Sequence, residues 1–359
     1  MNESLRRLAK FMVVRALSLF VTVVIAVFIA VFIANWGGAM DAHRKNEIRY
    51  QLSIQIAANP LYASLPSRET QALVNDLVEQ EFERQGLNRP FLVRSISYLG
   101  NAITLNLGRA ENITSDSGSR TVRLILLERL PPTLLLIGTA QLLSFLIAIL
   151  VALFLSRRYG SILDKTVIAL APTSAAPAWL YGLFLILLFA AVLRILPWGG
   201  MVQAPVPSTT IGYASSVLRH MVLPVTAMIL GGIFSSIYSW RTFFLIYSSE
   251  DYVELARAKG LSSKELERRY VLRPTLPTII TSFLMMVIYV WTGAIVLETV
   301  FNWPGIGRLY LLAVNLNDTP VIVGVVVILG YLLAGTVFLL EFIYAALDPR
   351  VRLGSQGGR

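Results

Sequence analysis

Long apolar runs separated by polar loops dominate the chain. Six of them are long enough to cross the apolar core of a bilayer, which takes about 20 residues in a helix. They lie near residues 11–35, 133–155, 167–193, 220–246, 277–299 and 320–346. Runs of this length lack the alternation of half-buried strands, and backbone in hydrocarbon must satisfy its own hydrogen bonds. The pattern therefore predicts an all-α integral membrane protein with six transmembrane helices.

Basic residues flank these predicted spans unevenly. Lys and Arg gather before the first span, between the second and third, between the fourth and fifth, and after the sixth. The short loops on the opposite side hold only Arg194, Arg219 and Arg308. Because cytoplasmic loops carry an excess of Lys and Arg, we expect a multi-pass protein of the cell membrane with both termini in the cytoplasm. The first run is longer than the core of a signal peptide, so we interpret it as a retained anchor.

The spans and loops divide the chain into four expected regions. These are a cytoplasmic N-terminus with the first span (1–35), an extracytoplasmic segment (36–132), a five-helix core (133–349) and a cytoplasmic tail (350–359). In the extracytoplasmic segment, apolar positions at helical spacing predict a helix over 68–85. Ser67 is its expected cap and Gly86 its expected stop. We expect this helix to pack on its own small domain.

Composition and charge narrow the function classes. Of the 359 residues, 55% are hydrophobic and 14% charged, with a formal net charge of +10 and no cysteine. A membrane chain gathers positive charge for topological reasons, so we expect no nucleic-acid binding. The sequence has no His pair at metal spacing, no Gly-x-Ser-x-Gly elbow and no phosphate-binding loop. We expect no catalytic residue, no metal site and no cofactor bound by this chain.

Ionisable residues are scarce within the predicted spans. Glu298 and Glu341 lie near span ends, where we interpret them as charges that reach the interface. A secondary transporter coupled to protons needs a carboxylate, His or Lys near the midplane, so this alternative is disfavoured. A structural or signalling membrane protein with a small sensor domain is the other alternative.

Polar and small residues within spans two to six are the candidate lining of a translocation path. Polar groups in hydrocarbon need partners or water, and they tend to turn toward the interior of a helical bundle. The candidates are Thr139, Gln141, Ser144, Thr173, Ser174, Ser235 and Ser236.

The polar loop between spans four and five, residues 248–275, carries the start and stop signals of two short helices. The predicted capping boxes are Ser248 with Asp251 and Ser262 with Glu265. Gly260 is the expected left-handed terminator of the first helix and Pro274 the stop of the second. Tyr252, Leu255, Ala256 and Lys259 share one face of the first helix at helical spacing. We interpret this face as a docking surface, with a plain connector between spans as the alternative.

Seven features resemble, in the same order, the permeases of ABC importers of the dipeptide and oligopeptide type. They are basic residues before span one, ERLPPTLLL, RRYGSILDK, HMVLP, EDYVELARAKGL, FNWPGIGRL and DPRVR. The resemblance implies the type I permease fold and a path for di- or oligopeptides. Nickel chelates and oligosaccharides are the alternative solutes within the family. The outer segment is longer than in compact members, and Ile246 stands where an acidic residue is common.

By the same resemblance, the loop 248–275 couples this chain to ATP hydrolysis by docking into an ATPase subunit. Its expected contact residues are Asp251, Tyr252, Glu254, Ala256, Arg257, Ala258, Lys259 and Gly260, of which Glu254, Ala256 and Gly260 match the family's loop motif. The implied partners are a second homologous permease, two ABC ATPase subunits that bind ATP and Mg²⁺, an extracytoplasmic solute-binding protein and the lipid bilayer.

The segment FNWPGIGRL after span five is predicted to be irregular. Pro304 disfavours helix at Trp303, while Gly305 and Gly307 permit conformations that other residues resist. Irregular backbone near a membrane needs protein or water as a partner, so we expect these four residues to shape the outer mouth of the path.

Overall fold

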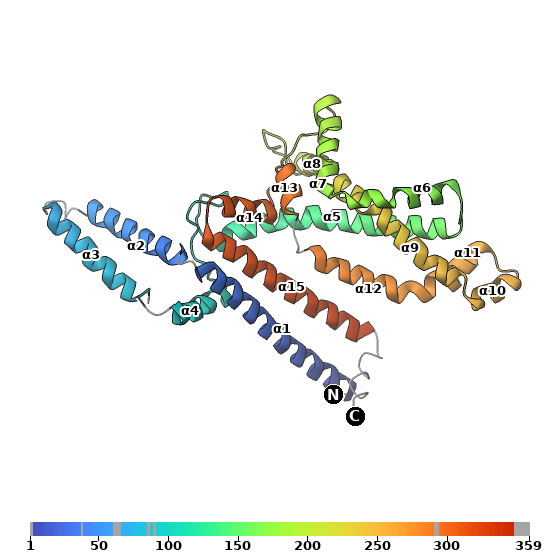
Figure 1. Ribbon diagram of the computed structural model, residues 1–359, viewed down its shortest axis with the longest axis horizontal. Coiled ribbons are helices and arrows are strands. Elements are labelled where there is room, and N and C mark those ends of the chain that lie inside the picture. The colour runs from blue at the N-terminus through green and yellow to red at the C-terminus, as the bar shows by residue number, and fades with distance from the viewer. Residues whose placement is uncertain are drawn as a thin grey trace. The chain divides into compact units, whose positions relative to one another are not determined.

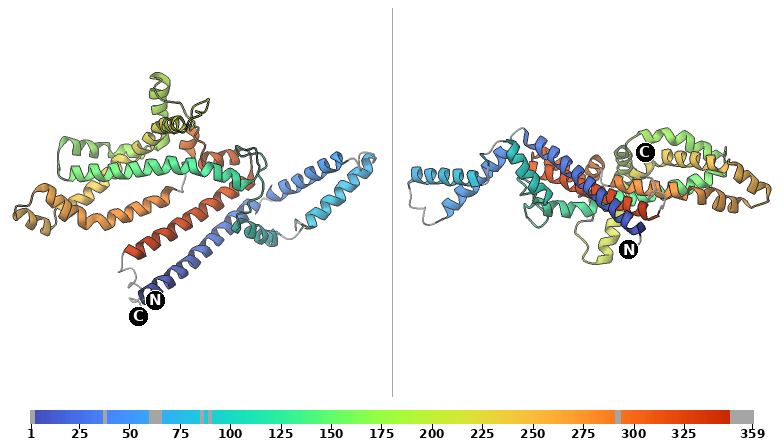
Figure 2. Two further views of the ribbon diagram at one scale, coloured as in Figure 1. Left: turned by 180° about the vertical axis from the view of Figure 1, so that it is seen from behind. Right: turned by 90° about the horizontal axis from the view of Figure 1, so that it is seen from below.

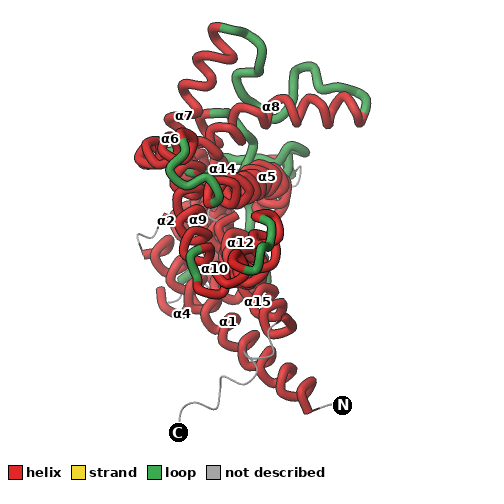
Figure 3. Tube along the Cα trace, turned by 90° about the vertical axis from the view of Figure 1, so that its right-hand side faces the viewer, coloured by secondary structure: helices red, strands yellow, loops and turns green. Residues whose placement is uncertain are grey.

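The computed structural model describes residues 3–36, 39–59, 66–84, 87–88, 91–290 and 294–347, and these are mostly helical, with loops that include residues 104–121 and 193–209 (Figure 3). Within these ranges there is no strand and one isolated antiparallel bridge, between Arg109 and Thr121. Five helices are long and apolar enough to cross a membrane, and a bent helix pair makes a sixth candidate. The predicted all-α membrane fold is therefore confirmed.

The helices follow one another along the chain as labelled in Figure 1. They are α1 Glu3–Trp36, α2 Ala39–Ala58, α3 Ser67–Arg84, α4 Phe91–Ile103, α5 Val122–Ser156, α6 Ile162–Leu170, α7 Ala178–Leu185, α8 Thr210–Leu230, α9 Ile233–Ser248, α10 Asp251–Ala258, α11 Ser263–Leu266, α12 Arg273–Tyr289, α13 Ile295–Val300, α14 Ile306–Asn315 and α15 Thr319–Leu347. A 3₁₀ turn, η1 (Ala171–Ala175), follows α6. Two π-helical segments, η2 (Ile186–Val192) and η3 (Glu267–Leu272), continue α7 and α11.

The chain forms two compact units. Unit 1 holds residues 1–126 and 312–359, and unit 2 holds residues 127–311, so the boundaries fall inside α5 and α14. In unit 1, α1 and α15 lie side by side in the views of Figures 1 and 2. Their shared core consists of Val23, Val27, Val31, Val323 and Val327, with Ala102 of α4 added. The first and last spans thus pack together.

Two polar contacts fasten the elements of unit 1. Arg15 of α1 forms an ion pair with Glu341 of α15, so the Glu341 carboxylate is paired within the protein. Asp318 is fully buried before α15, and its Oδ2 accepts backbone N–H groups from Asn112 at 2.8 Å and Ile113 at 3.1 Å. The sequence offered no sign of this carboxylate's role, because its partners lie far away along the chain.

The helix predicted over 68–85 is present as α3. Figure 1 shows α3 running back alongside α2. Their shared core consists of Ile48, Ile56, Val74, Val78, Phe82 and Leu87. The apolar face of α3 therefore packs on its own small domain, as predicted, whereas the stop expected at Gly86 lies outside the described residues.

Two of the predicted spans are broken in unit 2. The run 167–193 bends by 101° between η1 and α7, because Pro177 cannot donate to a continuing helix and restricts the residue before it. The run 220–246 is split at Gly231 and Gly232, where α8 ends and α9 begins. A Cβ on Gly231 would lie 3.1 Å from the Ala178 backbone, so the missing side chain lets α8 end against α7. The prediction of a continuous fourth span was wrong.

Two further helices begin earlier than predicted. The second span starts at Val122 and continues through Pro131 and Pro132. The fifth starts inside the polar loop, since α11, η3 and α12 form one candidate span, Ser263–Ile288. Pro274, predicted as a stop, lies instead in the first turn of α12. The wider π-helical turn before it makes room for the proline ring, which would clash with a carbonyl in a regular α-helix.

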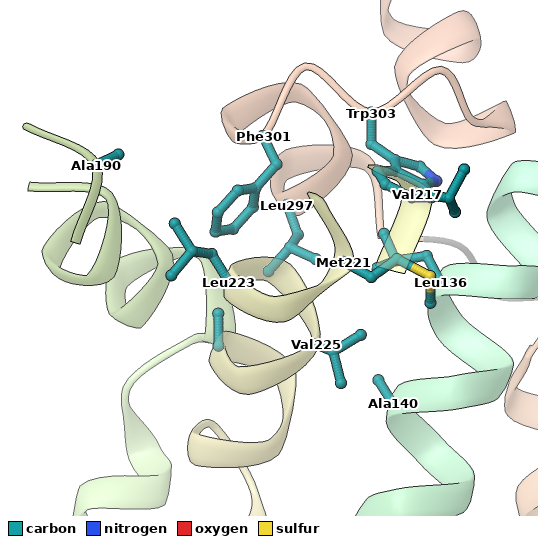
Figure 4. Packing of buried hydrophobic residues seen from close by; sticks show 11 residues of the cluster. Leu136, Ala140, Ala190, Val217, Met221, Leu223, Val225, Leu297, Phe301 and Trp303 are labelled. Carbon is teal, nitrogen blue, oxygen red and sulfur yellow. The ribbon is translucent and has the colours of Figure 1, made fainter. Parts of the chain in front are cut away.

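The core of unit 2 joins α5, α7 with η2, α8 and the segment around α13. It consists of Leu136, Ala140, Ala190, Val217, Met221, Leu223, Val225, Ala227, Leu297, Phe301 and Trp303 (Figure 4). A Cβ on Gly182 of α7 would lie 2.7 Å from the Phe301 ring, so this ring packs directly against backbone. The core holds the irregular segment after α13 in place.

Candidate functional site

The polar loop has the predicted first helix, α10, and the predicted hinge at Gly260. The second short helix is instead the beginning of the fifth span, Ser263–Ile288. Gly260 has φ +82°, the left-handed conformation of a helix terminator, and follows Lys259, the C-cap of α10. Beyond it, the chain turns back so that α10 packs on α11 and η3. Val253, Ala256 and Leu266 form a small buried core, with Leu261 and Tyr270 packed against it. The loop therefore has internal packing of its own.

The predicted capping boxes differ from the observed caps. Glu250, not Ser248, precedes α10, and it makes no side-chain capping bond. The Ser248 hydroxyl donates to the Leu245 carbonyl at 2.9 Å, so this serine belongs to the end of α9. Ser262 does precede α11, but its side chain makes no capping bond either.

The residues predicted to form the docking face are not all exposed in the structure. Ala256 is only 3% exposed and turns toward α11, whereas Leu255 is 59% exposed and Tyr252 is 39% exposed. The other expected contact residues, Asp251, Glu254, Arg257, Ala258, Lys259 and Gly260, are exposed. Placing Ala256 on the exposed face was wrong, because it shares with Val253 the face of α10 that packs on Leu266. These two residues are three apart, which is the one sequence signal for the inner face.

The candidate path residues on η1 and α9 come together. The Ser174 hydroxyl accepts the backbone N–H of Ser235 at 3.3 Å, and the Thr173 carbonyl accepts the Tyr181 hydroxyl at 2.6 Å. All seven candidates are exposed or half-buried within the chain. Their place along a path stays a prediction.

The three candidates on α5 do not share one face. Successive residues in a helix are about 100° apart, so Gln141 and Ser144 lie close together around α5 while Thr139 points elsewhere. The structure thus groups Gln141 with Ser144, and Thr173 and Ser174 with Ser235. Thr139 is separate from its two neighbours on α5.

The segment between α13 and α14 is irregular, as predicted. Residues 301–305 are not helical, and Asn302 has φ +51°. Trp303 is fully buried, and its indole N–H donates to the Pro132 carbonyl at 2.9 Å. A Cβ on Gly307 would lie 2.9 Å from the Ile295 Cα, so this glycine is required by space. Its backbone is helical within α14, so the special conformation expected there is not used.

The Glu298 carboxylate holds this segment in place through hydrogen bonds. It is fully buried and accepts the Thr133 hydroxyl at 2.8 Å and the Arg308 backbone N–H at 3.0 Å. The Thr133 oxygen in turn accepts the Ile306 N–H at 2.7 Å. The first N–H groups of α14 have no intrahelical acceptor and attract negative charge, so Glu298 acts as the cap of α14. Its interpretation as a charge that reaches the interface was wrong.

These features define an α-helical integral membrane protein with interrupted spans, polar positions along them and an ordered polar loop. Residues 144–353 match the family described as binding-protein-dependent transport system inner membrane component. The chain belongs to this family and is a transport subunit with the type I ABC permease fold.

Several named relatives align with three quarters of the chain. One, from Brucella suis biovar 1, carries the provisional name of peptide permease and is 31% identical over 75% of this chain and 82% of its own length. The di/tripeptide transport system permease DppB of Pseudomonas aeruginosa is 30% identical, over 76% of this chain and 84% of its own. The oligopeptide transport system permease AppB of Bacillus subtilis is 29% identical, with the same coverage of 76% and 84%.

Proposed function

We propose that this chain is one permease half of an ATP-driven importer of di- or oligopeptides. It forms the membrane path with a second homologous permease and receives peptides from an extracytoplasmic solute-binding protein. Two ATPase subunits bind ATP and Mg²⁺ and hydrolyse the nucleotide. Family membership supports the transport role, and the names of the relatives support peptides as the solute.

The observation that carries this proposal is the exposed helix α10. Leu255 is a large apolar side chain that stands 59% exposed on a polar loop, with the exposed charges of Glu254 and Arg257 beside it. An apolar anchor with a charged rim is the usual anatomy of a docking surface. The loop's buried core, Val253 with Ala256 and Leu266, holds this face in shape before any partner binds.

Transport by the reconstituted complex tests the function. Proteoliposomes that contain both permeases and both ATPases are expected to accumulate a labelled tripeptide only when ATP and the solute-binding protein are present. Uptake of a nickel chelate or an oligosaccharide in place of peptide would overturn the solute assignment. Uptake driven by a pH gradient without ATPase subunits would overturn the importer itself.

In the same assay, Leu255→Glu is expected to lower peptide-stimulated ATP hydrolysis and copurification of the ATPases at least about tenfold. Full burial of a leucine contributes about 1.5–3 kcal/mol, and a carboxylate in its place must also be desolvated. Lys264→Glu, a change at another exposed position of the loop, on α11, is the control and is expected to behave as wild type. Wild-type copurification of Leu255→Glu would contradict docking through α10. Ala256→Trp is unsuited to this purpose, because it would disrupt the loop's own core.

The membrane orientation is tested by single cysteines in this cysteine-free chain. Thr114→Cys before α5 and Ser262→Cys before α11 are both exposed positions. The basic flanks place the first outside and the second in the cytoplasm. A membrane-impermeant thiol reagent is therefore expected to label intact cells at Thr114→Cys and to label Ser262→Cys only after permeabilisation. The reverse pattern would invert the proposed topology.

A further inference from the structure

A group of charged residues in unit 2 connects the polar loop to the turn between α5 and α6, residues 157–161. Arg157 in this turn forms an ion pair with Glu267, the first residue of η3, at 2.8 Å. Glu267 directly follows α11, which packs on α10 through Leu266. One ion pair thus fastens η3, on which α10 packs, to the turn that follows α5.

The same turn is fastened to α6 and α9 by a buried carboxylate. Asp164 of α6 is 1% exposed and accepts the backbone N–H of Gly160 at 2.9 Å. Its two oxygens also accept the Nε–H and an Nη2–H of Arg241 on α9, and the Nη2 to Oδ2 distance is 2.6 Å. Arg241 is 6% exposed. The Arg241 Cζ lies 5.1 Å from the centre of the Tyr159 ring. The turn between α5 and α6 is therefore in contact with three elements, η3, α6 and α9.

Stability alone does not account for this arrangement. Arg157 is 40% exposed in its side chain, and ion pairs this exposed contribute little to stability. Replacing a buried pair such as Asp164 with Arg241 by apolar side chains is often neutral or stabilising. What the contacts do provide is a set of connections between elements. The Arg157 pair joins the turn to η3, and the Asp164 pair joins α6 to α9, while Asp164 also accepts a backbone N–H of the turn.

We propose that Arg157, Glu267, Asp164 and Arg241 form a latch that positions α5 and α6 relative to the polar loop. When α10 is displaced, its shared core moves η3 with it, Glu267 moves Arg157, and Asp164 carries the displacement to α6. This inference rests on the proposed docking of an ATPase on α10. It adds the residues through which that docking reaches the helices of the candidate path, since Gln141 and Ser144 lie on α5.

Charge reversal across the exposed pair tests the latch. Arg157→Glu and Glu267→Arg are each expected to lower the peptide transported per ATP hydrolysed about tenfold, with copurification of the ATPases unchanged, and the double exchange is expected to restore the ratio to within about twofold. Arg157→Gln, a milder change that does not create repulsion, is expected to act in the same direction. Arg269→Glu is the matched control, because its pair with Glu265 at 3.2 Å stays within the loop.

The outcomes separate the latch from the function on which it rests. A wild-type complex that moves no peptide is a failure of the proposed function, seen before any variant is made. If the wild type transports and both single reversals keep its ratio of peptide to ATP, the latch is wrong. Single reversals that fail without recovery in the double exchange would also overturn it, because the two charges would then act separately.

Discussion

Trp303→Ala is expected to lower the free energy of unfolding by about 3–5 kcal/mol, the range found for truncating a fully buried aromatic side chain. The Trp303 side chain is 0% exposed and lies in the core of unit 2 beside Val217 (Figure 4). Its loss leaves a cavity in the core and removes the hydrogen bond to the Pro132 carbonyl. Inside a membrane, packing of this kind supplies much of the stabilisation, because lipid is as apolar as the core.

The matched control for this change is Trp198→Ala. Trp198 also belongs to unit 2 but is 62% exposed, so its truncation is expected to stay within about 0.5 kcal/mol of wild type. Trp303→Phe keeps most of the aromatic packing but removes the hydrogen bond. We expect it to lower the free energy of unfolding by about 1 kcal/mol. Thermal unfolding in detergent, followed by intrinsic fluorescence, measures all three. Equal losses for Trp303→Ala and Trp198→Ala would contradict the packing described for this segment.

Glu298→Ala is expected to cost about 3 kcal/mol in the same measurement. Without the carboxylate, the Arg308 N–H and the Thr133 hydroxyl lose their acceptor in a buried site, and each unsatisfied donor costs about 1–3 kcal/mol. Glu298→Gln retains one acceptor oxygen but places an amide N–H₂ group against donors, so we expect an intermediate loss. A loss below about 0.5 kcal/mol for Glu298→Ala would show that the carboxylate is not the cap of α14.

A double-mutant cycle with Gly305 sharpens this test. A Cβ on Gly305 would collide with the Glu298 carboxylate, so Gly305→Ala is expected to cost about 1–3 kcal/mol in the wild-type background. In the Glu298→Ala background the colliding group is absent and the cost of Gly305→Ala is expected to fall. Gly138→Ala is the control, because a Cβ there meets nothing within 4 Å. Strictly additive losses would contradict the contact between the two residues.

Trp303 and Glu298 both connect the irregular segment to α5. Trp303 is bound to Pro132 and Glu298 to Thr133, two neighbouring residues of α5. A shift of α5 would therefore carry the segment with it. If Trp303, Pro304, Gly305 and Gly307 shape the outer mouth of the path, as the sequence predicts, α5 is the helix that connects this mouth with the turn that bears Arg157.

The sequence by itself determined the class of the protein and the features that depend on neighbouring residues. Each span must satisfy its own backbone hydrogen bonds in hydrocarbon, so a run of about 20 apolar residues announces a span without reference to the rest of the chain. The hinge at Gly260 and the irregular segment at Trp303 were predictable for a similar reason. Glycine and proline restrict or release the backbone locally, whatever the chain packs against.

Only the tertiary structure decided where the helices break and what the buried charges do. The break at Gly231 depends on the close approach of Ala178, and the inward turn of Ala256 depends on Leu266 across the hinge. Asp164 lies 77 residues from Arg241, and Glu298 lies 165 residues from Thr133. A side chain's burial and its hydrogen-bond partners are set by what the folded chain brings beside it, and contacts over such separations leave no local pattern. For this reason the sequence indicated an interfacial charge at Glu298, whereas the structure shows a buried carboxylate with partners on α5 and α14.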